Sequence, residues 1–164
     1  MNKLFLVALV CAAPFVLGTA AYLLGWSTGV TSNYGELISP PRPVAGMDAL
    51  RGKWVLVAFD AAACDAYCER KLYFMRQVRR AQGKEMERVE RLWVLTDAGK
   101  PRTELLAAIE GTRIQGLTPF DGQAREHIYL VDPLGNLMMR FPRDPDPSRV
   151  IKDLQRLMKY SRFG

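Results

Sequence analysis

The chain has 164 residues, of which 49% are hydrophobic and 24% charged, with a formal net charge of +6 at pH 7. This composition is typical of one compact domain and excludes a disordered or collagen-like polymer. Three cysteines are too few for a scaffold held together by disulfides. Basic residues gather at 76–80 and 152–162 with helical spacing, which favours solvated helix faces, with anionic headgroups or an acidic partner as the alternative. No base-reading module is evident, so we expect no nucleic-acid partner.

The N-terminal segment differs from the rest of the chain. Leu4 to Leu24 are 21 residues without a charged side chain, which is long enough to cross a membrane as a helix. Lys3 precedes this run and the next charge is Glu36, so the positive-inside rule places the N-terminus in the cytoplasm. We therefore predict a transmembrane anchor over residues 1–25 of a bacterial inner-membrane protein, with the remainder in the periplasm. Small residues at 18–20 leave signal-peptide cleavage as the alternative, although the apolar run is longer than such peptides need.

Residues 26–49 are rich in Ser, Thr, Asn and Gly and contain the run Pro40-Pro41-Arg42-Pro43. This composition offers little apolar surface and favours extended backbone. We therefore expect an extended linker here, followed by one folded domain over residues 50–164.

The folded domain alternates predicted strands and helices. Strands are expected at short apolar runs, and helices where apolar residues recur every three or four positions among charges. In chain order these are strands 54–59 and 91–96 with helices 65–82 and 103–110, a hairpin of strands 127–131 and 136–141, and a closing helix that begins at Asp146-Pro147. This order predicts an α/β domain with a mixed sheet flanked by helices.

Cys64 and Cys68 lie between the first strand and the first helix of the domain, at the sheet edge where α/β proteins usually place their sites. The helix N-terminus favours a thiolate at Cys64, whereas the neighbouring Asp65 opposes it. Four residues apart in a regular helix, two cysteines are too distant for a disulfide, so bridging requires Cys64 to lie outside regular helix. Two cysteines that are too far apart for a disulfide are instead suited to binding a metal ion. We expect both sulfurs to be exposed, with an inert structural disulfide as the alternative.

The single histidine, His127, begins the third predicted strand, where a sheet edge can bring it toward the cysteine loop. Two thiolates and one imidazole make a three-coordinate site whose soft sulfur ligands select copper. Zinc normally requires a fourth protein ligand in a closed site. The alternative is an ordinary surface or capping histidine.

Four features together resemble the Sco/SenC group of membrane-anchored, thioredoxin-like cytochrome c oxidase assembly proteins. They are the apolar N-terminus, the strand Lys53–Phe59, the Cys-x3-Cys pair and the strand and turn Ile128–Gly135. The resemblance spans about residues 50–160. It implies a thioredoxin-like fold in which two cysteines and a histidine hold copper for the CuA centre of a cytochrome c oxidase subunit, or reduce the cysteines of that centre.

By position, Cys64 and Cys68 match the cysteine pair of the Sco group. The group commonly has a proline where this chain has Asp65, and its histidine would fall at Ala124, so His127 is a displaced candidate ligand. The resemblance implies copper delivery as the leading function. The alternatives are a copper-free thiol–disulfide oxidoreductase, in which Cys64 attacks and Cys68 resolves the intermediate, and a non-catalytic assembly scaffold with a decayed site.

Overall fold

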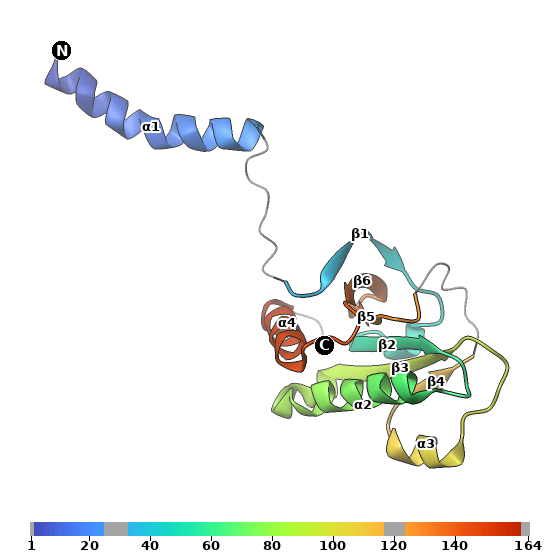
Figure 1. Ribbon diagram of the computed structural model, residues 1–164. Helices are drawn as coiled ribbons and strands as arrows, with labels where there is room; N and C mark the ends of the chain where they lie inside the picture. The colour runs from blue at the N-terminus through green and yellow to red at the C-terminus, as the bar shows by residue number, and fades with distance from the viewer. Residues whose placement is uncertain (1, 25–32, 117–123, 162–164) are drawn as a thin grey trace. The chain divides into compact units, whose positions relative to one another are not determined.

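The computed structural model describes residues 2–24, 33–116 and 124–161, in an N-terminal unit and a second unit that begins at Asn33. The N-terminal unit contains helix α1, Lys3–Leu23 (Figure 1). Its segment Leu6–Leu23 has a mean hydropathy of 2.1 and is long and apolar enough to cross a membrane. The predicted N-terminal apolar helix is therefore present.

The second unit is built on one six-stranded mixed sheet. Its strands are β1 (Glu36–Pro43), β2 (Trp54–Asp60), β3 (Val89–Leu95), β4 (Arg113–Gln115), β5 (Ile128–Val131) and β6 (Asn136–Phe141). Their order across the sheet is β1-β6-β5-β2-β3-β4. β2, β3 and β4 run parallel, while β5, β6 and β1 add antiparallel pairs. The predicted mixed sheet with a terminal hairpin is confirmed.

Helices cover one face of this sheet. They are α2 (Ala66–Arg80), α3 (Thr103–Ala108) and α4 (Pro147–Tyr160). Elsewhere in this unit, short 3-10 helices span Asp48–Leu50 and Gly83–Arg88. α2 lies across β2 and β3 in Figure 1, and side chains such as Leu72 and Leu154 join Trp93 in a core on that face. Asp146 caps α4 through the backbone N–H of Ser148 at 2.8 Å, as its place before Pro147 predicts.

Residues before β2 cover the other face. Met47 and Leu50 pack with Val57 and Tyr129 in a second buried cluster. Because both faces are covered, all seven residues of β2 are buried. This agrees with the uninterrupted apolar sequence from which a central strand was predicted.

The segment that we assigned to the linker contributes an edge strand. Residues 36–43 form β1, which pairs antiparallel with β6. The strand is held at its start, where the N–H groups of Tyr34 and Gly35 donate to a carboxylate oxygen of Asp153 at 2.8 and 2.9 Å. Prolines are tolerated at a sheet edge, and the hydrogen-bonding partners come from β6 rather than from the segment itself. The composition of this segment therefore does not reveal that it forms a strand. The three-residue β4 was also not predicted.

We expect Asp153→Ala to lower the free energy of unfolding by about 1–3 kcal/mol, because two backbone N–H groups lose their acceptor. Asp153 is buried on α4, whereas the adjacent Lys152 is exposed. Lys152→Ala is the matched control and should change stability by less than about 0.5 kcal/mol. Urea denaturation of the full chain in detergent measures both variants, and equal effects would contradict a specific role for Asp153.

Candidate functional site

The two cysteines lie at the carboxyl end of β2, as predicted. Cys64 is in the loop just before α2, with a left-handed φ of +39°, and Cys68 is in the first turn of that helix. Because Cys64 is outside regular helix, the two Cα atoms are 5.2 Å apart and the sulfurs form a disulfide. The structural condition that the sequence set for a bridge is therefore met.

The expectation that both sulfurs are exposed is wrong. Cys64 is 3% exposed and Cys68 is fully buried, and both belong to the core beneath α2. The segment after β3 lies against the cysteine loop: Asp97 accepts a hydrogen bond from Ala62 N at 2.9 Å, and Arg102 donates to the Cys64 carbonyl oxygen at 3.3 Å. These two hydrogen bonds fix the cysteine loop to the segment after β3.

A charge network centred on a buried carboxylate lies at the same end of β2 as the disulfide. Asp60, the last residue of β2, is fully buried, and its two oxygens pair with different cations. Oδ2 is 2.5 Å from Lys71 Nζ, and Oδ1 is 2.6 Å from Arg125 Nε. Lys71 also donates to the Arg125 carbonyl oxygen. Burial lowers the pKa of Lys71, and the Asp60 carboxylate opposes that shift.

Asp65 joins this network to the start of α2. Its side chain accepts from the N–H groups of Tyr67 and Cys68 at 3.1 and 2.9 Å, which makes it the N-cap. Its second oxygen is 2.6 Å from Arg125 Nη2. The Cys68 N–H and the Arg125 guanidinium hold the pKa of Asp65 below its usual value. The negative charge that the sequence places next to Cys64 is thus compensated by Arg125.

The structure does not bring His127 to the cysteines. Its Nδ1 donates to the Phe141 carbonyl oxygen at 2.8 Å, and its ring packs edge-on against Tyr129. Alternate residues of a strand face opposite sides of the sheet. Ile128 lies in the core that contains the cysteines, while Tyr129 lies in the opposite core. His127, two residues before Tyr129, is on that opposite side.

The expected three-ligand copper site is consequently not assembled. Within residues 2–24, 33–116 and 124–161, no group of three His, Cys, Asp or Glu side chains is placed to hold a metal ion. Ala124, where the Sco resemblance would place the histidine, instead exchanges backbone hydrogen bonds with the Tyr129 hydroxyl, at 2.9 and 3.2 Å.

Sequence reasoning missed the three charged residues of the network. Two of them do have a signal in the sequence. Asp60 ends an otherwise apolar buried strand, and Lys71 falls on the α2 stripe formed by Cys68, Leu72 and Met75. A lysine on a buried stripe requires a buried acidic partner. Arg125 precedes a strand and follows no periodic pattern, so nothing local indicates it.

Comparison with known families places this site in a class of proteins. Residues 54–161, more than half of the chain, match the family described as a transmembrane-like, thioredoxin-like C-terminal domain. The chain belongs to this family. The thioredoxin-like fold predicted from the sequence is thereby confirmed. No curated protein matches the chain by sequence.

Solved structures with this fold include several Sco proteins. Apo Sco1 from Thermus thermophilus is 19% identical with a TM-score of 0.56, covering 79% of this chain and 99% of that chain. Yeast Sco1 with copper bound is 20% identical with a TM-score of 0.55, covering 68% and 82%. Bradyrhizobium japonicum ScoI with copper bound is 22% identical with a TM-score of 0.51, covering 66% and 87%. The Sco resemblance is thus confirmed in the fold.

We expect Asp60→Ala to destabilise the second unit by about 3–5 kcal/mol, because it leaves the buried Lys71 ammonium without its carboxylate. Adding Lys71→Met should recover a substantial part of this loss. A double-mutant cycle measured by urea denaturation tests the coupling. Lys100→Met, at an exposed position, is the control for loss of a lysine and should have little effect. Additive effects of the two core substitutions would contradict the pairing.

Proposed function

We propose that this protein is a membrane-anchored, Sco-like thiol–disulfide exchange protein that assists assembly of cytochrome c oxidase through Cys64 and Cys68. The observation on which this proposal depends is the disulfide between these residues at the carboxyl edge of β2. The family assignment and the Sco-like fold support it. The partner that this function requires is an oxidase subunit whose CuA cysteines must be reduced before they bind metal.

In the reducing direction, the Cys64 thiolate attacks one sulfur of a partner disulfide. A mixed disulfide forms and one partner thiolate leaves. The Cys68 thiolate then attacks the Cys64 sulfur, which releases the second partner thiolate and forms the Cys64–Cys68 bond seen in the structure. Two electrons pass from the dithiol to the partner. The roles follow from burial, since Cys64 retains some exposure and Cys68 has none.

Two features of α2 favour the thiolate form of Cys68. The residue lies in the first turn, where the helix dipole stabilises negative charge. Lys71 follows it by three residues on the same buried face, so a cation lies one turn away. The Asp65 carboxylate is held by Arg125, which limits its repulsion of a developing thiolate.

Membrane attachment and a periplasmic domain are further parts of the proposal. Helix α1 has the length and hydropathy of a membrane span, and the matching family is described as transmembrane-like. Lys3 before this helix supports a cytoplasmic N-terminus. A disulfide persists on the oxidising side of the membrane, which supports a periplasmic location for Cys64 and Cys68.

Trapping of the mixed disulfide tests the exchange mechanism. Cys11→Ser removes the exposed third cysteine from every sample. In that background, reduced Cys68→Ser should accumulate a mixed disulfide with oxidised glutathione or with an oxidised CuA domain, at least about tenfold faster than Cys64→Ser, because Cys68 is fully buried. Non-reducing electrophoresis of the full chain in detergent measures the adduct.

Equal rates for the two variants would contradict the assigned roles. If neither variant forms an adduct, the disulfide is structural and the scaffold alternative is favoured. Retained assembly of the oxidase in a Cys64→Ser/Cys68→Ser double variant would support the same conclusion.

Copper carriage is a second candidate, and the copper-bound Sco structures that share this fold favour it. In the reduced protein, the thiolates of Cys64 and Cys68 would supply two soft ligands that select Cu(I). His127 would not contribute, because it lies on the other side of the sheet and its Nδ1 is engaged by Phe141. Copper would be cargo that passes to the partner by ligand exchange.

For this candidate we expect the anaerobically reduced full chain to bind a single Cu(I) per chain. The metal should be lost in Cys64→Ser and retained in His127→Ala, as measured by copper and protein content after desalting. Loss of copper in His127→Ala would show that the imidazole reaches the sulfurs once the disulfide is reduced. Absence of copper in the unsubstituted chain would reject carriage and leave thiol exchange.

A further inference from the structure

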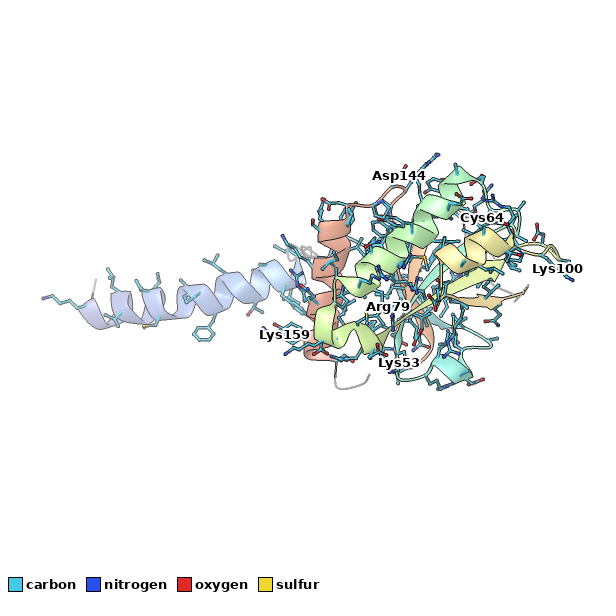
Figure 2. All side chains as sticks on the ribbon, turned by 90° about the horizontal axis from the view of Figure 1, so that it is seen from below. Lys53, Cys64, Arg79, Lys100, Asp144 and Lys159 are labelled. Atoms are coloured by element: carbon cyan, nitrogen blue, oxygen red, sulfur yellow. A yellow bond between two sulfur atoms is a disulfide. The ribbon has the colours of Figure 1, made fainter. Side chains whose placement is uncertain are left out.

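Four arginines surround a small cavity at the C-terminal end of α2. Arg76, Arg79 and Arg80 lie on one side of this helix, at spacings of three and four residues, and Arg91 lies on β3 beneath it. The cavity has a volume of about 180 Å³, and its other lining residues are Met86 and Glu110. Four of the six lining residues are therefore arginines, against one glutamate. Figure 2 shows Arg79 well separated from Cys64, which lies just before the start of α2.

Arg91 has an incomplete set of partners. The residue is 3% exposed, and its Nη2 donates to the Glu110 carbonyl oxygen at 2.7 Å. Its Nε and Nη1 are buried and have no hydrogen-bond partner among the described residues. Buried arginine is normally paired, because an uncompensated charge away from water is costly. Two free donors on one buried guanidinium therefore indicate a missing acceptor.

The neighbouring arginines add positive charge around Arg91 and supply no acceptor for it. Arg76 donates to the Ala108 carbonyl oxygen at 2.9 Å, and Arg79 donates to that of Val89 at 2.6 Å, so both use neutral acceptors. Among the residues that the structure describes, their only ion pair joins Arg79 to the exposed Glu87 at 3.5 Å. Burial lowers the pKa of Arg91, and the charges of Arg79, Arg76 and Arg80 lower it further. A bound anion would offset the repulsion among these positive charges.

We propose that this cavity binds an oxyanion of the phosphate class, held by Arg91 and by the three arginines of α2 that line it. Guanidinium groups suit such ligands because their planar donors match phosphate oxygens in pairs. The size agrees, since about 180 Å³ holds a phosphate with a few waters of about 30 Å³ each. It is smaller than the roughly 300 Å³ at which pockets for larger organic ligands begin. The site is independent of the disulfide chemistry.

Titration with inorganic phosphate tests this site. The full chain is purified in a non-ionic detergent, and calorimetry follows binding at ionic strength matched with chloride. We expect saturable binding of one phosphate per chain, abolished in Arg91→Met. Arg80→Gln should weaken binding by about tenfold or more, the effect of losing one hydrogen bond to a charged group.

Arg42→Gln is the matched control, because it removes the same charge from an exposed position on β1. Binding no stronger than that of chloride, or equal binding in Arg42→Gln and Arg80→Gln, would overturn the proposal. Arg80 is exposed, so its variant decides the matter even where Arg91→Met fails to fold.

A second arm identifies the source of the oxyanion. The titration is repeated in phosphatidylcholine nanodiscs with and without phosphatidylglycerol. Weaker apparent affinity for phosphate in the presence of phosphatidylglycerol assigns the site to a lipid headgroup that competes for it. Equal affinity in the two discs assigns it to a free phosphate or phosphomonoester.

Discussion

Asp60 ends the central strand with a fully buried carboxylate, and both of its oxygens are paired with cations. Removing such a group from water costs several kcal/mol, so its partners must be held in place. Lys71 comes from α2 and Arg125 from the segment before β5, and Arg125 also holds Asp65, the N-cap of α2. The groups that neutralise Asp60 thereby join the strand, the helix and the loop between them. The position of Cys64 and Cys68 depends on this connection.

The same network shapes the charge around the disulfide. Asp60 and Asp65 carry two negative charges near the sulfurs, and Lys71 and Arg125 carry two positive ones. Without Arg125, the carboxylate next to Cys64 would oppose formation of a thiolate, as its place in the sequence suggests. With it, the partial charge of the α2 N-terminus is not cancelled by a neighbouring anion. The charged side chains around the disulfide are therefore nearly balanced, two against two.

Local patterns predicted most of the fold, because strands such as β2 and helices such as α2 bury continuous runs or regular stripes of their own apolar residues. They failed for β1, whose hydrogen bonds come from β6 and whose entry depends on the distant Asp153. In the site, the sequence predicted the place of the cysteines and the condition for their disulfide. It did not predict their burial, because the core that encloses them includes residues from distant parts of the chain, such as Leu105 and Ile128. The side of the sheet that His127 faces follows from strand register, which a strand boundary alone does not specify.

The buried charge at the N-terminal end of α2 is fully paired, whereas the buried charge beside its C-terminal end is not. At the N-terminal end, Asp60 has both oxygens paired and needs no further ligand. At the C-terminal end, Arg79 and Arg80 are in the last turn, where the helix dipole favours cations. The dipole accounts for the arginines of the helix itself. It does not provide an acceptor for Arg91, which lies on β3 and has two buried donors without a partner among the described residues. Neither the dipole nor the exposed Glu87 supplies an acceptor for those donors. The protein's own cations neutralise Asp60, whereas Arg91 depends on the anion of the proposed site.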